Sequence, residues 1–169
     1  MAGDVARERP TPLNKAVSAQ MQKMRRSSTA PEMLIRRELH RRGLRFRVNF
    51  PLLPGRPDLA FTSARIAIFV DGCFWHACPD HGILPKNNRE WWRDKLERNV
   101  ARDREKDEEL DKLGWAVVHV WEHEDPVIAA DAIQQLWRSR RQLVTRRAGM
   151  PAGAVTCEIR VDVHESGRI

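Results

Sequence analysis

The segment DGCFWHACPDH, residues 71–81, concentrates reactive side chains: two thiols, two imidazoles, two carboxylates and two adjacent aromatic rings. Within it the spacing Cys73-x4-Cys78-x2-His81, with His123 following 42 residues later, offers four nitrogen and sulfur ligands. A closed tetrahedral zinc site needs ligands of this number and type. The plainer reading is two buried thiols and two solvated histidines, because Cys-x2-His also arises by chance. We favour a zinc site that would stabilise a loop lacking secondary structure of its own.

His76 lies between the two cysteines and could replace His81 as a ligand. Because a closed zinc site needs only four groups, we interpret His76 as a free imidazole, which is suited to act as a general base. Upstream, Pro57 stiffens the start of a predicted strand at Asp58. A carboxylate at a sheet edge is a natural Mg²⁺ ligand, and phosphodiester cleavage needs a metal and a base. Taken alone, Asp58 could be a turn residue. Its combination with His76 favours a role in a catalytic site, where Asp71 could add a second carboxylate.

Glu32 has two interpretations. The run Thr29-Ala30-Pro31-Glu32 is a capping-box pattern, in which the glutamate accepts a hydrogen bond from the backbone at the start of a helix. The carboxylate could instead bind a second metal or hold a water molecule near a catalytic site. From the residues alone, capping is the stronger interpretation.

The aromatic composition is unusual, since the chain contains six tryptophans and no tyrosine. Phe74 and Trp75 lie in the predicted loop beside His76, and Trp91 and Trp92 open a predicted helix. Loop aromatics of DNA-binding proteins can insert between base pairs and unstack them. The alternative is that these rings only form a hydrophobic seal over the metal-binding loop.

The charge of the chain is concentrated near its N-terminus. Residues 1–49 hold 12 Lys and Arg against 4 Asp and Glu, whereas residues 50–169 hold 18 against 19. Such clustering is typical of a protein that binds a polyanion, although a solubilising surface would look the same. No segment has the apolar length of a membrane span or a signal peptide, so we expect a cytoplasmic protein. The odd third cysteine, Cys157, also argues against a disulfide framework.

Hydrophobic periodicity predicts one α/β domain with the order α-β-β-β-α-β-α. The expected helices cover residues 29–43, 90–113 and 131–143, and the expected strands cover 44–50, 57–61, 65–70 and 115–121. The long helix between the last two strands implies a crossover, and therefore a mixed sheet covered on both faces. We expect residues 1–28 to be a basic arm, residues 29–143 the core, and residues 144–169 an extension in which 156–163 could form a strand.

Several segments together resemble the very short patch repair DNA mismatch endonucleases. They are PGRPD (54–58), GCFWH (72–76), Trp92 with NV-x-RD (99–103), LGW (113–115) and VWE (120–122). The similarity runs in order from about Ser18 to about Glu124. It implies a restriction-endonuclease-like mixed sheet flanked by helices, with a structural zinc site.

The resemblance also implies an activity, which is a strand-specific, Mg²⁺-dependent nick 5′ of the thymine in a T:G mismatch. Such mismatches arise when 5-methylcytosine deaminates. By matching motifs, Asp58 and the backbone carbonyl of Val70 would hold Mg²⁺, and His76 would activate water. Glu32 matches a glutamate of the active-site region, whereas at Asp71 the family's best-known member has a histidine.

Further residues match the family's DNA and zinc contacts. Phe74, Trp75 and Trp92 resemble aromatics that intercalate beside the mismatch, and Met21 resembles a methionine that inserts from the minor groove. The family's mixed zinc ligands correspond here to Cys73, Cys78, His81 and His123.

The expected partner is double-stranded DNA carrying a mismatch, with mismatch-repair proteins as candidate recruiters. We expect a monomer, since a mismatch has no two-fold symmetry, and association with the nucleoid when DNA is bound. Two alternatives remain: a nuclease for another mismatch or a modified base, and a non-catalytic zinc-stabilised DNA-binding module.

Overall fold

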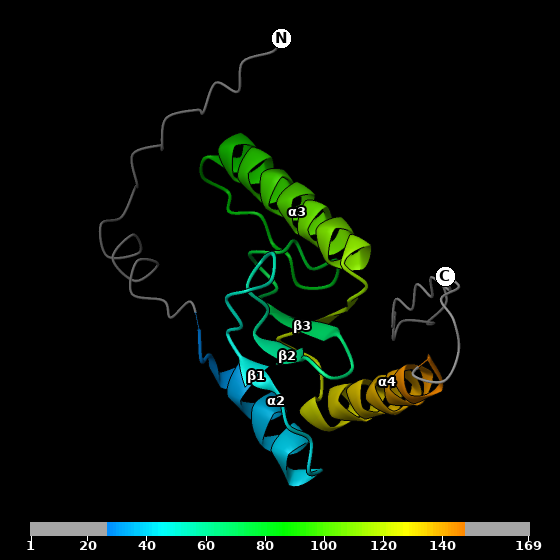
Figure 1. Ribbon diagram of the computed structural model, residues 1–169. Helices are drawn as coiled ribbons and strands as arrows, with labels where there is room; N and C mark the ends of the chain where they lie inside the picture. Colours follow the sequence, from blue (N-terminus) through cyan, green and yellow to red (C-terminus); the bar gives the residue numbers. More distant parts are fainter. Residues whose placement is uncertain (1–26, 148–169) are drawn as a thin grey trace, which may run out of the picture.

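A four-stranded mixed sheet forms the centre of the protein, for which a computed structural model describes residues 27–147 (Figure 1). The strands lie in the order β1-β2-β3-β4, with antiparallel β1–β2 and β2–β3 pairs and a parallel β3–β4 pair. Their bounds are Arg47–Val48, Leu59–Phe61, Ile66–Asp71 and Ala116–Trp121. The parallel pair requires a crossover, which α3 (Arg89–Lys112) supplies. The predicted α/β class and mixed sheet are therefore confirmed.

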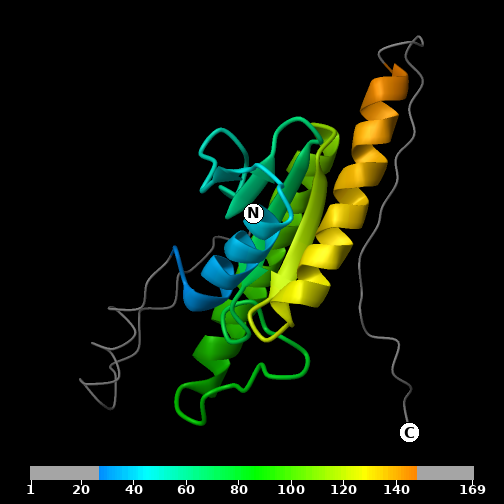
Figure 2. The same cartoon turned by 90° about the horizontal axis from the view of Figure 1, so that it is seen from below.

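Helices cover both faces of this sheet. In Figures 1 and 2, α2 (Ala30–Arg41) and α4 (Pro126–Arg147) lie on one face and α3 lies on the other. Alternate residues of the strands point to opposite faces, so the core has two parts. The larger part contains Ile35, Leu39, Leu44, Leu59, Phe61, Ala64, Ile66, Ile68, Val118, Val120, Ala129, Ala130 and Ile133. The smaller part, beneath α3, contains Leu53, Ala60, Ala67 and Leu110.

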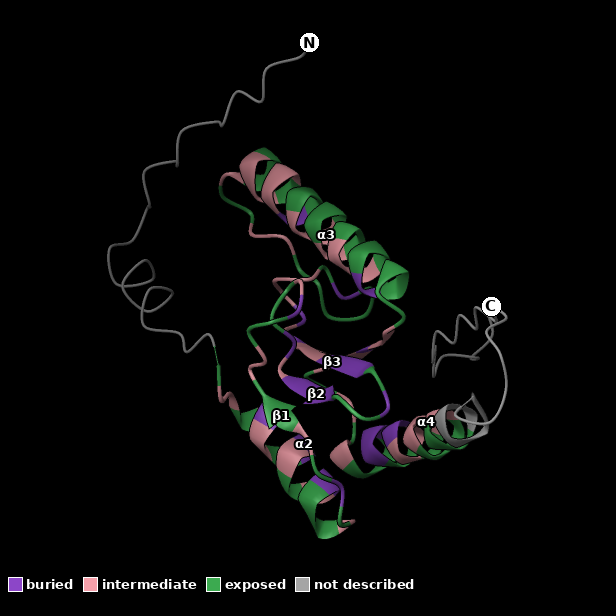
Figure 3. Cartoon of the chain, viewed as in Figure 1, coloured by how far each residue is buried: buried purple, intermediate pink, exposed green. Residues whose placement is uncertain are grey.

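Burial follows this layering, and the strands β2 and β3 are the most deeply enclosed elements (Figure 3). Apolar residues fill β3 from Ile66 onward, but its last residue, Asp71, is charged and only 6% exposed. His119 similarly interrupts the valine-rich β4. Buried charge at one end of an otherwise apolar sheet marks that end as the place to look for function.

The first strand is shorter than its sequence pattern predicts. Alternation over residues 44–50 predicted a continuous strand, but regular pairing is confined to Arg47–Val48 because Asn49 has a φ of 46°. Pairing nevertheless continues irregularly, since the N–H groups of Asn49 and Phe50 donate to the carbonyls of Asp58 and Pro57 at 3.0 and 3.1 Å. The kink therefore holds the chain around Asp58 against β1.

The last helix begins earlier than the predicted residue 131. Pro126 occupies its first position, where a missing N–H costs nothing and the fixed φ is helical. The Asp125 Oδ1 atom accepts hydrogen bonds from the N–H groups of Val127 and Ile128 at 2.7 and 3.2 Å. Asp-Pro is thus an N-cap signal that the apolar periodicity alone did not reveal.

Several expectations fall outside the described residues. These are residues 1–26 of the expected basic arm, including Met21, and the strand expected at 156–163. Among the described residues, no helix combines the length and apolarity that crossing a bilayer requires.

Substitution of Asp125 by alanine tests the N-cap of α4. Loss of the two capping hydrogen bonds should lower the free energy of unfolding by about 1 kcal/mol, measured by chemical denaturation. Ser139→Ala is the matched control, because this exposed α4 hydroxyl donates only to the Gln135 carbonyl and should change stability by less than about 0.5 kcal/mol. If both substitutions lowered the free energy of unfolding equally, the proposed N-cap role of Asp125 would be contradicted.

Candidate functional site

Asp58 immediately precedes β2 and is held by contacts with Asn49, just after β1, and with Val70 in β3. Its carbonyl accepts from the Asn49 N–H, and its Oδ2 atom accepts from the Val70 N–H at 2.8 Å. Burial and the nearby Asp71 carboxylate raise the pKa of Asp58, against the opposing effects of the Val70 N–H, Arg36 and His76. The N–H and C=O of a strand residue point to the same side, so the Val70 carbonyl faces the edge at which Asp58 lies.

His76 lies in the loop after β3, with one ring nitrogen directed at acidic groups. Its Nδ1 atom is 2.8 Å from Asp103 Oδ2, in α3, and 3.8 Å from Asp71 Oδ1. Burial opposes the charged imidazole, but the Asp103 hydrogen bond and the Asp71 carboxylate prevail and raise the pKa of His76. Because Nδ1 is engaged, Nε2 is the nitrogen left to exchange a proton with a reacting group.

A second histidine extends this group across the sheet. His119 Nδ1 lies 2.6 Å from Asp71 Oδ2, and His119 Nε2 lies 3.1 and 3.2 Å from the two oxygens of Asp107, in α3. Although burial favours the neutral ring, the hydrogen bonds that the ring donates to Asp107 and Asp71 raise the pKa of His119 to about 10. Asp71 is therefore shared between two imidazoles.

Glu32 is buried and fully engaged at the start of α2. Its Oε2 atom accepts from the Thr29 N–H at 3.1 Å, as a capping box requires, and its Oε1 atom pairs with Arg36. Arg36 is also close enough to Asp58 to lower the pKa of that carboxyl. Glu32 is thereby linked to Asp58 through one guanidinium, while its own oxygens serve the helix cap and the ion pair.

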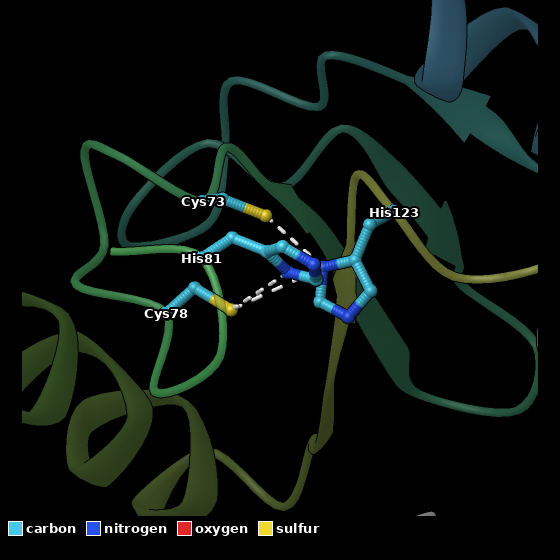
Figure 4. A group of neighbouring side chains, drawn as sticks. All are labelled: Cys73, Cys78, His81 and His123. Atoms are coloured by element: carbon cyan, nitrogen blue, oxygen red, sulfur yellow. Dashed lines mark hydrogen bonds between the residues drawn. The ribbon is translucent and has the colours of Figure 1, made fainter. Parts of the chain in front are cut away.

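The four metal-ligand candidates converge in space (Figure 4). Cys73 and Cys78 come from the loop after β3, His81 from the same loop, and His123 from the turn after β4, and one ligand atom of each lies within 4.8 Å of the others. The contacts Cys73 Sγ–His123 Nδ1, Cys78 Sγ–His81 Nδ1 and Cys78 Sγ–His123 Nδ1 measure 3.0, 3.8 and 3.9 Å. Sulfur and nitrogen ligands of tetrahedral zinc lie about 3.5 Å apart, so the group fits such an ion.

Without a metal, the electrostatics of this cluster disfavour the thiolate form of Cys73. Burial, followed by the Cys78 sulfur and the Glu122 carboxylate, raises the pKa of the Cys73 thiol to about 12. A bound divalent cation reverses this preference, because it stabilises the thiolate directly. Glu122 Oε1 also accepts from the Cys73 N–H at 2.7 Å, which attaches the loop to the end of β4.

Aromatic rings gather beside this loop. Phe74 lies 5.1 Å from Trp75 and 5.2 Å from Trp92, measured between ring centroids, and Trp91 lies 4.9 Å from Trp92. The Lys95 Nζ atom is 5.8, 4.9 and 5.7 Å from the ring centroids of Trp75, Trp91 and Trp92. All four rings are only half-buried. Stackable rings with a cation among them can contact both bases and phosphate.

The structure thus brings together most residues that the sequence singled out and adds others. Asp58, Val70 and His76 share one end of the sheet, the zinc candidates form an adjacent cluster, and Met21 lies outside the described residues. Sequence reasoning missed the roles of Arg36, Asp103, Asp107 and His119. Two signals could have found the last three: aspartates four residues apart on one face of α3, and a histidine inside an apolar strand.

A mixed sheet flanked by helices, with carboxylates and imidazoles at one end and a Cys/His cluster beside them, defines a restriction-endonuclease-like protein. A family model described as "DNA mismatch endonuclease Vsr" matches residues 13–80. The chain is 46% identical over 129 residues to "Type II nicking enzyme V.NaeI" of Lentzea aerocolonigenes, which covers 73% of this chain and 78% of that protein.

Other relatives agree with this match. The chain is 41% identical over 108 residues to "DNA mismatch endonuclease Vsr" of Escherichia coli K12, covering 62% of this chain and 68% of that protein. It is 34% identical over 128 residues to "Type II nicking enzyme V.NmeAIP" of Neisseria meningitidis, covering 73% and 91%. The chain therefore belongs to the Vsr family of DNA mismatch endonucleases.

Proposed function

We propose that this protein nicks double-stranded DNA 5′ of the thymine in a T:G mismatch, using Mg²⁺, and so acts in very short patch repair after 5-methylcytosine deamination. The observation that carries the proposal is the placement of Asp58 and His76 at one end of the sheet, next to an aromatic cluster with Lys95. Asp58 and His76 supply the groups that phosphodiester hydrolysis needs, and the aromatic cluster supplies a surface that can unstack a base pair.

Asp58 and the Val70 carbonyl are the groups that would hold Mg²⁺. Both oxygens are hard donors of the kind the ion prefers. Burial and the nearby Asp71 carboxylate raise the pKa of Asp58, and a bound cation would offset both effects. When bound, the ion would neutralise charge on the scissile phosphate. Glu32 would contribute indirectly, since its partner Arg36 also acts on Asp58.

His76 would take the proton of the attacking water at Nε2. Asp103 and Asp71 would fix the ring through Nδ1 and stabilise the imidazolium that forms. Phe74, Trp75 and Trp92 would enter the base stack from the loop and from α3, and Met21 would insert from the opposite groove. One chain would serve one mismatch, because the target lacks two-fold symmetry.

Cleavage of end-labelled duplexes that differ by a single T:G pair tests the proposal. In the presence of Mg²⁺, the wild-type protein should produce one nick 5′ of the mismatched thymine, and Asp58→Asn should slow it by about a hundredfold or more. Asp111→Asn, at the exposed C-terminal end of α3, is the matched control and should nick normally. Cleavage of other mismatches or of matched DNA would indicate a nuclease with a different target, and binding without cleavage would indicate a non-catalytic module.

The pH dependence of nicking tests the role of His76. A general base must be neutral, and the pKa of His76 is raised by Asp103, so the rate should rise as pH increases through that raised value. Asp103→Asn removes the hydrogen bond that raises the pKa and should move this acidic limb to lower pH, measured in single-turnover assays with Mg²⁺ held constant. An acidic limb at the same pH in both proteins would contradict the assignment.

We also propose that Cys73, Cys78, His81 and His123 hold one structural Zn²⁺. Elemental analysis should find about one zinc per chain, and a strong chelator should lower the melting temperature. Cys78→Ser should lose both the metal and this sensitivity, whereas Cys157→Ser, the remaining cysteine of the chain, should retain both. Equal zinc content in the two variants would argue against the cluster.

A further inference from the structure

His119 occupies an unusual position, because both nitrogens of its ring face carboxylates. Nδ1 lies 2.6 Å from Asp71, and Nε2 lies 3.1 Å from Asp107. An ionised carboxylate only accepts hydrogen bonds, so each nitrogen carries a proton and the ring is a cation. The ring also stacks on Phe69, with centroids 5.3 Å apart and planes inclined by 17°. Its orientation is therefore fixed from three sides.

These contacts belong to a series of five side chains whose two ends lie on the same helix. Asp107 leads to His119 in β4, then to Asp71 at the end of β3, then to His76 in the loop, and finally to Asp103, which lies four residues before Asp107 in α3. Acidic and imidazole groups alternate from Asp107 to Asp103, and the backbone of α3 joins these two ends into a circuit. Each member therefore constrains its neighbours, and the circuit connects helix, sheet and loop at the candidate site.

Asp71 is the member that most needs this support. It is only 6% exposed and lies near a second carboxylate, Asp58, whose pKa it raises. A buried carboxylate without a cationic partner is costly, and it responds by taking up a proton or turning to another partner. His119 engages the Oδ2 atom of Asp71 and leaves Oδ1 facing His76.

We propose that His119 is a positioning residue of the nuclease site: through Asp71 it holds the His76 ring with Nδ1 toward the carboxylates and Nε2 toward the reacting centre. This inference rests on the proposed function of His76 as the base. His119 itself does not contact the reacting atoms. Removing it should lower the rate of the chemical step while leaving the binding of DNA largely intact.

Two substitutions separate the contacts of His119. In His119→Asn the side-chain amide nitrogen replaces Nδ1 and keeps a donor for Asp71, whereas in His119→Gln it replaces Nε2 and keeps a donor for Asp107. The Gln variant should slow single-turnover nicking by about 10- to 100-fold, the size of effect seen when groups that orient active-site residues are removed. The Asn variant should lose at most about fivefold, and the dissociation constant for the duplex should change by less than about threefold in both.

His40→Gln is the matched control, because His40 is an exposed imidazole near the end of α2 that packs against Phe46, and it should nick like the wild type. Melting temperatures of all variants report on folding. A nicking rate clearly higher in His119→Asn than in His119→Gln, at similar melting temperatures, supports the proposal. Equal rates in the two variants, or losses that follow the melting temperature or DNA affinity, would overturn it.

A readout without catalysis separates this inference from the proposed function. The ¹H–¹⁵N signals of the His76 ring should match the wild type in His119→Asn and shift in His119→Gln. Should the wild type cleave no duplex at all, the proposed function fails while this comparison still decides the positioning role. Unchanged His76 signals in both variants would overturn that role.

Discussion

The parallel pairing of β3 with β4 is the constraint from which the whole site follows. The register places Asp71 opposite Trp121, and the Glu122 N–H donates to the Asp71 carbonyl at 2.9 Å. Within the sheet, this pairing brings His119 beside Asp71. Beyond the strands, it brings His123 to Cys73 and the Glu122 carboxylate to the Cys73 N–H. A shift of one residue would turn every side chain to the other face and separate both groups at once.

Electrostatic balance is the second condition that the fold meets at this end of the sheet. Four carboxylates gather here, from Asp58, Asp71, Asp103 and Asp107, and they would repel one another in a partly buried setting. His119 and His76 lie between them, and Lys106 Nζ lies 3.7 Å from Asp103. Asp58 is the carboxylate with the weakest compensation, since burial and Asp71 still raise its pKa. A site that is balanced everywhere except at one carboxylate is suited to accept a cation at that point.

The architecture could be predicted from the sequence because the hydrophobic periodicity, the helix caps and the turn residues all indicated the same elements. Short, mostly apolar runs predicted β2, β3 and β4, and the crossover helix α3 implied a parallel pair. The start of α4 was missed because Asp125-Pro126 lies before the apolar pattern. For β1, the alternation did not foresee the positive φ of Asn49. Propensity describes the interior of an element well, but its ends depend on single hydrogen bonds.

At the site, the sequence could predict functional groups that lie close together along the chain. It could not show which distant residues come into contact when the chain folds. Cys73, Cys78 and His81 lie within nine residues, so their spacing already indicated a common ligand set. The contact of His119 with Asp107 is apparent only when α3 packs against the sheet and joins residues 12 positions apart, and its contact with Asp71 only when β3 pairs with β4 across 48 positions. The role of Arg36 could not be predicted from the sequence either. Its position between Glu32 and Asp58 depends on how α2 packs against the sheet.

The proposed zinc site and the proposed catalytic base are coupled in this protein because one loop carries both. The loop after β3 contains Cys73 and Cys78, and between them stand Phe74, Trp75 and His76. No regular secondary structure orders that stretch, so its conformation depends on its ends: the cysteine cluster, the Glu122 contact and the Asn99 Nδ2 hydrogen bond to the Trp75 carbonyl. Loss of any one of these contacts would add conformations to the segment that presents the proposed base and the aromatic rings. A general base displaced by about 1 Å loses much of its catalytic advantage. A ligand cluster that only stabilised the fold could lie anywhere on the surface, whereas one that encloses His76 also determines where the imidazole stands.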